Sequence, residues 1–442
     1  MSTVQQPLCQ LHTAFTLSAD QLNRIAASFL RDMTEGLQRR PSSLAMLPSF
    51  LTKPTGQEQG TFLALDFGGT NVRVLLVELK GKGKHTILAR RDVPLADLSK
   101  GYDYTSSTAT AAELFGFLAS QLALLAMPGK TYLLGHTFSF PCRQTGTNQA
   151  VLLHWTKEIK TTGVVGHNIV ELLQQALTER SLSYIHPTAL VNDTVSALLA
   201  VAYQDSQADI GSICGTGHNT CYLEPAPASL PKPMYINIEA GNFDKAPGNK
   251  YDVLLDNNSA CPGAGRLEKM CAGRYIGELL RLAILDLIDQ RALFNGSSPA
   301  FLLTANALTG KDVAALSTAS SATLEHIPTW LARKGSTIET TYEERQILQT
   351  AASLIASRSA RLAAATYTAI IRHIDPAMNK SHTIAIDGSL YEKLPGYAQT
   401  ITATLQELLG EQARQINCVL TKDGSGTGAA IAAATTLHAL SR

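Results

Sequence analysis

The stretch LALDFGGTNVRV, residues 63–74, limits the possible fold more than any other part of the sequence. An apolar run from Phe62 to Asp66 precedes two glycines, and a second β-type run extends from Val72 to Leu79. This pattern predicts a β-hairpin with a Gly-Gly turn. Glycines let successive backbone N–H groups approach an anion, so the turn is also a candidate phosphate site. The residues alone favour a phosphate turn and a plain hairpin turn equally.

The rest of the chain alternates strand-like and helix-like patterns, which is typical of an α/β protein. A second glycine turn near residue 215 also lies beside β-type runs, which hints at two related lobes. Residues 291–340 are rich in Gly, Ser and Thr and predict short helices and exposed loops. The expected strands are 131–135, 189–191, 210–214, 220–223, 234–238 and 383–386, and the expected helices are 17–40, 110–126, 166–179, 194–204, 264–290, 342–373, 397–413 and 427–440.

Composition limits the class of protein. A chain of 442 residues with 45% hydrophobic and 17% charged residues is long enough for two large lobes with substantial cores. The net charge of +1 gives no reason to expect nucleic acid or an anionic membrane as a partner. Seven cysteines without a CxxC pair indicate neither a disulfide framework nor a zinc site. Without a signal-like start or an apolar run near the roughly 18 residues of a spanning helix, we expect a soluble cytoplasmic protein.

Two further glycine-rich segments are candidates for anion binding. GSICGTGHN, residues 211–219, contains the second turn, where Thr216 reaches toward a phosphate. DGSGTGAAIAAATTLHAL, residues 423–440, reads as a Gly-rich loop that leads into an Ala-rich helix. The positive end of a helix and its unpaired N–H groups attract an anion. An ordinary helix cap explains the last segment equally well.

Taken together, these segments resemble the hexokinase family, within the larger group of actin-like ATPases and sugar kinases. The resemblance covers roughly residues 45 to 435. It implies an α/β, two-lobed actin-like ATPase (ribonuclease H-like) fold with a sugar cleft, a small domain at 57–191 and a large domain at 1–56 and 192–442. The matching segments, in family order, are MLPSFL (46–51), LALDFGGTNVRVLLVEL (63–79), HTFSFPC (136–142), HWTK (154–157), VVGHNIVELL (164–173), VNDT (191–194), GTGHNTCY (215–222), INIEAGNF (236–243), CPGAGRLEKMCAGRYIGELL (261–280), DGSLY (387–391) and DGSGTGAA (423–430).

The resemblance implies transfer of a phosphoryl group from ATP to the 6-hydroxyl of glucose, with Mg²⁺ as a cofactor. Asp193 is implied as the general base and Lys157 as a positive charge near the transferring group. The alternative for Asp193 is a helix N-cap. The implied sugar-binding residues are Ser139, Thr156, Lys157, Asn192, Asp193, Asn219, Glu239 and Glu268. The implied nucleotide-binding residues are Asp66, which also holds the metal directly or through water, and Gly68, Gly69, Thr70, Asn71, Gly215, Thr216, Gly388, Ser389, Gly424 and Ser425.

Three positions depart from the family pattern and leave alternatives open. Glu158-Ile159 stand where Gly-Phe is usual, Ala240 replaces a Trp, and Thr427 replaces a Lys or Arg. The alternatives are a sensor that binds sugar without catalysis, a kinase for mannose, fructose, glucosamine or another sugar, and a filament protein like actin. The expected partners are glucose and ATP, and the expected state is a monomer or homodimer.

Overall fold

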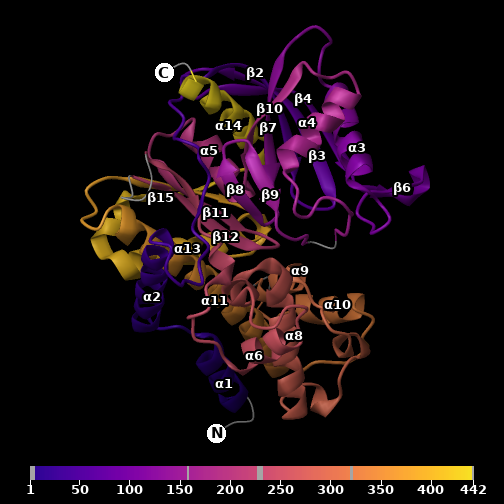
Figure 1. Cartoon of the computed structure of the whole chain (residues 1–442). Coiled ribbons are helices and arrows are strands. Elements are labelled where there is room, and N and C mark those ends of the chain that lie inside the picture. Colours follow the sequence, from indigo (N-terminus) through magenta and orange to yellow (C-terminus); the bar gives the residue numbers. More distant parts are fainter. Residues whose placement is uncertain (1–4, 157–158, 226–231, 319–321, 441–442) are drawn as a thin grey trace.

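The computed structural model describes residues 5–156, 159–225, 232–318 and 322–440. Two β-sheets lie one above the other with helices between them, and a mainly helical layer forms the end of the molecule that holds the N-terminus (Figure 1). The upper sheet has the strand order β10-β7-β2-β3-β4. Its strands are β2 (Gln59–Phe67), β3 (Asn71–Lys80), β4 (His85–Pro94), β7 (Tyr132–Phe138) and β10 (Ile185–Val191).

The second sheet has the order β1-β13-β12-β11-β14-β15. Its strands are β1 (Leu47–Pro48), β11 (Ala208–Cys214), β12 (His218–Glu224), β13 (Met234–Asn237), β14 (His382–Asp387) and β15 (Ile416–Leu420). Two short ribbons stand apart from these sheets: β5 (Ala96–Asp97) with β6 (Tyr102–Asp103), and β8 (Cys142–Gly146) with β9 (Gln149–Leu152).

The two sheets repeat one topology. In each, three successive strands pair antiparallel, namely β2-β3-β4 and β11-β12-β13. In each, two later strands then add in parallel beside the first strand, namely β7 and β10, and β14 and β15. The two predicted glycine turns join β2 to β3 and β11 to β12. The expectation of two related lobes is therefore matched by the strand order.

Two helices fill the space between the sheets. They are α5 (Asp193–Ala202) and α14 (Gly424–Leu440), and their apolar side chains share one core cluster with residues of both sheets. Glycines allow this close packing: a Cβ added to Gly135 of β7 would lie 1.8 Å from the backbone oxygen of Ala429. The predicted loop at the start of α14 is wrong, because the helix begins at Gly424 and these glycines lie inside it.

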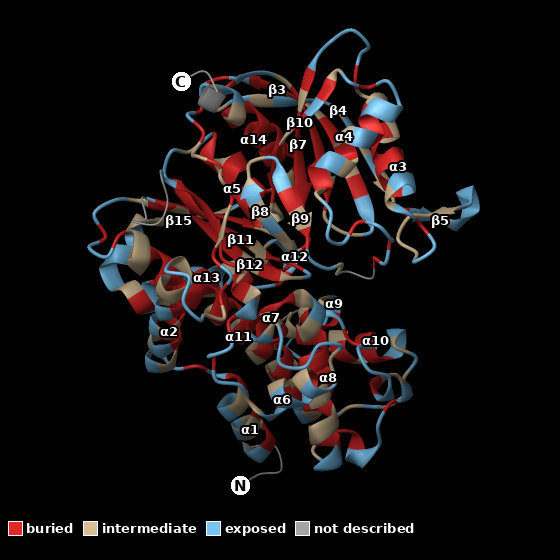
Figure 2. Cartoon of the chain, in the orientation of Figure 1, coloured by how far each residue is buried: buried red, intermediate tan, exposed pale blue. Residues whose placement is uncertain are grey.

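The remaining helices lie outside the space between the two sheets. α3 and α4 share a core cluster with the upper sheet, whereas α11, the longest helix, is buried in the helical layer (Figure 2). The bounds are α1 (Gln5–Phe15), α2 (Ala19–Leu37), α3 (Ala111–Ala123), α4 (Ile169–Glu179), α6 (Lys250–Asn257), α7 (Arg266–Cys271), α8 (Gly273–Asp289), α9 (Gly310–Ser317), α10 (His326–Arg333), α11 (Tyr342–Ile374), α12 (Ser389–Lys393) and α13 (Tyr397–Leu409), with 3₁₀ turns at Leu98–Lys100, Ala240–Asn242, Phe294–Gly296, Ala300–Leu303 and Gly410–Gln415.

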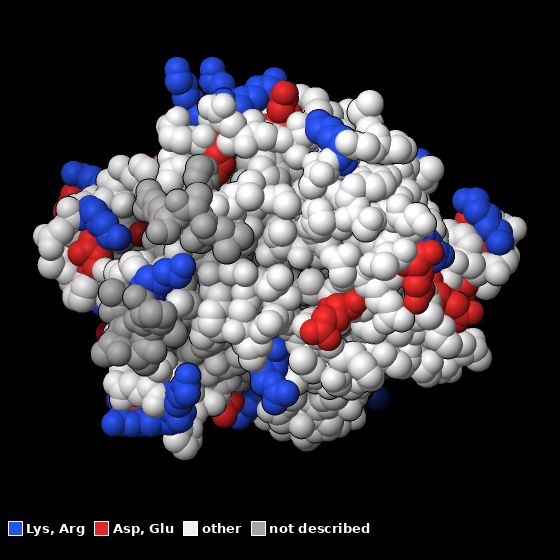
Figure 3. Space-filling model, turned by 45° about the horizontal axis from the view of Figure 1, so that its top comes forward, with Lys and Arg blue, Asp and Glu red and all other residues white. Residues whose placement is uncertain are grey.

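The predicted helix 264–290 is two helices that meet at Ala272, whose backbone is extended (φ −81°, ψ 149°). The short helices expected within 291–340 are present as α9 and α10. None of the helices that the structure describes is long and apolar enough to cross a membrane. On the face shown in Figure 3, basic and acidic side chains gather mainly toward the outline, with uncharged residues between them.

Candidate active site

The carboxyl ends of the parallel strands carry most of the predicted site residues. In the upper sheet, Asp66 is the last residue but one of β2, Ser139 follows β7 and Asn192 follows β10. In the second sheet, Gly215 follows β11 and Gly388 follows β14. Parallel strands bring their carboxyl ends to one edge of a sheet, where ligands of α/β proteins bind. Each sheet therefore brings its own part of the predicted site to one edge.

Asp193 and Asn192 begin helix α5. The side chain of Asn192 accepts a hydrogen bond from the Thr194 N–H at 2.9 Å, so Asn192 is the N-cap. Oδ1 of Asp193 accepts from the same N–H at 2.8 Å and from the Thr194 hydroxyl at 3.2 Å. Within the described parts of the chain, no donor binds Oδ2 of Asp193. The alternative of Asp193 as the N-cap is therefore wrong, because Asn192 takes that place. Only one oxygen of Asp193 binds the first turn of α5, and the other is available as a proton acceptor.

The upper lobe contributes Ser139 and Thr156. The Ser139 N–H donates to the Phe67 carbonyl at 3.2 Å, which holds Ser139 beside the first glycine turn. Thr156 is half-buried and follows Trp155. The Trp155 indole donates to the Thr161 carbonyl at 2.8 Å, and its ring packs against Phe140. The loop before Lys157 is therefore anchored, whereas Lys157 itself, a predicted catalytic residue, lies outside the described residues.

On the second sheet, three predicted sugar ligands lie around β12 and β13. The Asn219 amide nitrogen donates to Asn237 at 2.9 Å, and Asn237 donates to Glu239 at 2.8 Å. Glu268 of α7 accepts from the His218 N–H at 3.3 Å. The structure thus brings Asn219, Glu239 and Glu268 to one region. Asn237 was not predicted, because it is one polar residue at the end of the apolar strand MYIN.

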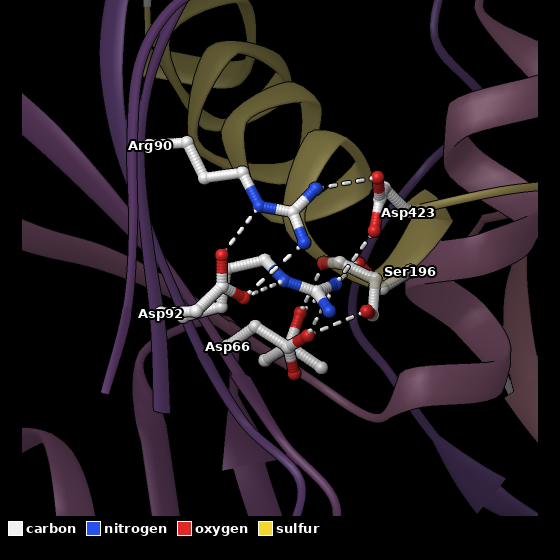
Figure 4. A network of polar contacts seen from close by, with 8 residues as sticks. Asp66, Arg90, Asp92, Ser196 and Asp423 are labelled. Atoms are coloured by element: carbon white, nitrogen blue, oxygen red, sulfur yellow. Dashed lines mark hydrogen bonds and ion pairs between the residues drawn. The ribbon is translucent and has the colours of Figure 1, made fainter. Parts of the chain in front are cut away.

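The first glycine turn is linked to the start of α14 by a network of charges (Figure 4). Oδ2 of Asp66 accepts from the Ser425 hydroxyl at 2.6 Å, and Arg73 lies 3.6 Å from the same oxygen. Arg73 also pairs with Asp423 at 3.0 Å, and Arg90 of β4 pairs with Asp423 at 2.7 Å. Arg73 and Arg90 were not among the predicted residues, since nothing in the sequence links them to residues more than 300 positions away.

The second glycine turn is held by two close backbone approaches. A Cβ on Gly388, whose φ is +124°, would lie 2.4 Å from the Cys214 carbonyl carbon, so this position requires glycine. The Gly273 N–H of α8 donates to the Gly215 carbonyl at 2.8 Å, and the Arg274 N–H donates to the Thr216 carbonyl at 3.1 Å. The backbone of Arg274, an exposed residue, therefore adjoins this turn, and its guanidinium lies over the Tyr275 ring, 5.8 Å from the ring centroid. The sequence analysis did not single it out.

Another unpredicted residue, Asp387, lies at the end of β14. Its pKa is raised to about 6, mainly by burial and also by the charges of Asp193, Asp66 and Asp423, while a hydrogen bond from the Gly388 N–H lowers it. These three carboxylates, from separate segments of the chain, thus lie close enough to Asp387 for their charges to raise its pKa. The motif DGSLY was interpreted for its Gly and Ser, and the carboxylate before them was overlooked.

The described positions that depart from the family pattern are buried. Ile159 belongs to the hydrophobic core beside the upper sheet, and Ala240 belongs to the core that the second sheet shares with the helical layer. The Thr427 side chain, 4% exposed, lies inside the first turns of α14. These substitutions therefore change packing in the described structure. Glu158 lies outside the described residues.

Comparison with known proteins decides the family. Two models described as hexokinase match residues 7–203 and 209–435. The chain belongs to the hexokinase family. Hexokinase-1 of Schizosaccharomyces pombe is 35% identical, and the alignment covers 98% of this chain and 91% of the relative. Hexokinase-7 of Oryza sativa subsp. japonica is 36% identical, and the alignment covers 98% of this chain and 97% of that relative.

Solved hexokinase structures confirm the predicted fold. One hexokinase crystal structure is 31% identical, covers 99% of this chain and 100% of that chain, and has a TM-score of 0.88. The structure of the Schistosoma mansoni hexokinase complexed with glucose is 33% identical in sequence. The match covers 98% of this chain and 99% of that chain, with a TM-score of 0.84. The chain is accordingly an ATP-dependent hexokinase that phosphorylates hexoses, the kinase activity with which glycolysis begins.

Proposed function

We propose that this hexokinase transfers the γ-phosphoryl group of ATP to the 6-hydroxyl of D-glucose, with mannose and fructose as further substrates. One observation carries the proposal: each predicted phosphate turn adjoins a predicted sugar residue. A Cβ on Gly68 would lie 3.3 Å from the Ser139 hydroxyl, and a Cβ on Gly217 would lie 2.8 Å from Glu268 Oε1. Direct transfer requires such adjacency of donor and acceptor sites. The glucose complex of the Schistosoma mansoni relative supports glucose as the hexose.

In the proposed mechanism, Asp193 orients the 6-hydroxyl and accepts its proton through Oδ2 as the new bond forms. Oδ1 stays bound to Thr194, which keeps the carboxylate fixed relative to helix α5. Asn192 and Asn219 donate to sugar hydroxyls, while Glu239 and Glu268 accept from them. Ser139, Thr156 and Lys157 complete the ring from the upper lobe. A sugar that lacks one of these hydroxyls would leave a buried polar group unpaired, which gives specificity.

We propose that the nucleotide binds between the two glycine turns. One side of the nucleotide site is formed by the first turn, with Gly68, Gly69, Thr70 and Asn71. The other side is formed by Gly215, Thr216, Gly388, Ser389, Gly424 and Ser425. The Arg73 side chain lies beside the first turn and the backbone of Arg274 binds the second, and in this proposal both residues provide positive charge for the phosphates. Lys157 serves the transferring group itself.

The residues present fit Mg²⁺, which favours one or two carboxylates together with phosphate oxygens and waters. In the described residues, no group of three or more His, Cys, Asp or Glu side chains converges on a metal position. Asp66 would therefore hold the ion, directly or through water, with the phosphates as further ligands. When bound, Mg²⁺ offsets the charge of the phosphates. The acidic surroundings of Asp387 would otherwise repel ATP.

The proposed sugar residues come from both lobes, so complete binding requires the lobes to close over the sugar. We keep the division into a small domain at 57–191 and a large domain at 1–56 and 192–442 as a proposal. Closure would exclude water, which competes with the sugar as phosphoryl acceptor. We further propose that the enzyme works in the cytoplasm, as a monomer or homodimer.

Intrinsic fluorescence tests the proposed sugar site. The chain has two tryptophans, and Trp330 lies on α10 in the helical layer, whereas Trp155 directly precedes Thr156. In a Trp330→Phe variant, we expect glucose to change the Trp155 emission with half-saturation between about 1 μM and 1 mM. The matched Trp155→Phe variant should show no change. If the Trp155 emission stays constant at glucose concentrations that saturate the rate of phosphorylation, the placement of the sugar beside this loop is contradicted.

A further inference from the structure

Asn237 is the last residue of β13 and is 6% exposed. Its carbonyl oxygen Oδ1 accepts from the Asn219 amide at 2.9 Å. Its own amide nitrogen donates to Oε1 of Glu239 at 2.8 Å. Asn237 therefore connects two residues that we propose to bind the sugar.

These bonds fix which way the Asn219 amide points. Its oxygen accepts from the backbone N–H groups of Thr220 at 2.7 Å and Ala240 at 3.1 Å. One amide hydrogen goes to Asn237, and within the described residues the other has no acceptor. Asn219 can therefore act toward a sugar hydroxyl only as a single donor.

Asn237 must itself be an amide in this arrangement. It accepts from Asn219 on one side and donates to a carboxylate on the other, and an uncharged amide does both at once. An aspartate of the same shape can accept from Asn219 but cannot donate to Glu239 unless it is protonated.

The backbone around Glu239 indicates that this carboxylate is held in place. Glu239 has φ 57° and ψ 51°, a left-handed conformation that is uncommon for a residue with a side chain. Such strained positions persist where the surroundings determine them, and they gather at functional sites. The Glu239 N–H donates to Oδ1 of Asn237 at 3.4 Å, a second contact that steadies this conformation.

We infer that Asn237 is a positioning residue for the hexose site: it orients the Glu239 carboxylate as an acceptor and the Asn219 amide as a donor. The inference rests on the proposed roles of Glu239 and Asn219 in sugar binding. Asn237 acts on the sugar through these two residues.

The test is Asn237→Asp, which keeps the shape of the side chain. At pH 8 it places two carboxylates at hydrogen-bond distance, and their repulsion displaces Glu239. We expect KM for glucose to rise about tenfold or more, while KM for ATP changes less than about twofold. Toward pH 5.5, the two carboxylates share a proton, which restores a donor, so KM should move back toward the wild-type value measured at the same pH.

Two other titratable groups near Glu239 could affect how KM for glucose depends on pH. Cys142 of β8 faces Glu239, and burial together with the charge of Glu239 raises the pKa of its thiol to about 12, so it does not titrate in this range. Glu268 of α7 lies beside Gly241, two residues after Glu239, and is the same in wild type and variant. The wild-type profile therefore corrects for both groups.

Asn168→Asp is a matched control, since Asn168 also donates to a carboxylate, that of Glu171, at 2.9 Å, but at the start of α4. It should leave KM for glucose unchanged. Asn237→Ala should raise KM for glucose without recovery at low pH, because no proton can restore the missing donor. Thermal unfolding of each variant shows whether it is folded.

Two results would overturn the inference. In the first, Asn237→Asp leaves KM for glucose unchanged at every pH, although Glu239→Gln raises it. In the second, Asn237→Asp raises KM for glucose and for ATP together and without pH dependence, as general structural damage would. If Glu239→Gln also has no effect on KM for glucose, the proposed sugar role of Glu239 is itself wrong.

Discussion

Replacing Asp193 with asparagine is expected to lower kcat for hexose phosphorylation by about 10²–10⁴-fold, the usual contribution of a general base. Asparagine has the same shape, and its oxygen can still accept from the Thr194 N–H, as Oδ1 of Asp193 does at 2.8 Å. Helix α5 should therefore begin as before, and unfolding should change little. Only the oxygen that takes the proton is lost. Steady-state kinetics with glucose and ATP, beside thermal unfolding, measures both effects.

The matched control for this variant is Asp20→Asn. Asp20 also lies in the first turn of a helix, α2, but is exposed. Its replacement should leave kcat unchanged. If the Asp193→Asn variant keeps kcat within about threefold of wild type, Asp193 is not the general base, since such a loss is far below that expected.

Gly428→Ala is expected to destabilise the protein by about 1–3 kcal/mol or more, the cost of overpacking a core. A Cβ on Gly428 would lie 1.8 Å from the backbone oxygen of Ser196, and a backbone atom cannot move aside without shifting helix α5. Ser196 also donates to the Ser425 carbonyl at 2.5 Å. The shift should therefore reach the nucleotide side and raise KM for ATP. Denaturant unfolding and kinetics with varied ATP measure the two effects.

Gly116→Ala is the matched helical control, in α3. There a new Cβ would meet the end of the flexible Arg180 side chain at 2.8 Å, which can move away. Because alanine favours helix by about 1 kcal/mol over glycine, this variant should be neutral or more stable. Equal losses of stability in both variants would contradict the role of Gly428 in packing α14 against α5.

The local elements with strong patterns were predictable from the sequence. The hairpin around Gly68-Gly69 and the buried strand β14 are where the apolar runs indicated. β4 was missed because it is an edge strand with many exposed residues, among them Arg90. The helix expected at 264–290 breaks at Ala272 because the Gly273 N–H donates to the carbonyl of Gly215, in the second glycine turn.

The candidate site was predictable where a residue type and its place in a motif indicate chemistry. Asp193, which follows an apolar strand, and Glu239 were singled out in this way, and their roles stay proposals. Arg73, Arg90 and Asn237 were missed because their roles depend on partners that only the fold brings together. The glycines at the start of α14 serve helix packing, which no local pattern distinguishes from a phosphate loop.

The most direct test mixes the purified protein with ATP, Mg²⁺ and each of several hexoses, and follows the products by phosphorus NMR. We predict that glucose and ATP are converted one to one into glucose 6-phosphate and ADP, at a rate of about 1–10³ s⁻¹. The opposite result, in which sugar binding is detected by calorimetry but no hexose is phosphorylated, would contradict the proposed enzyme and favour a sugar sensor.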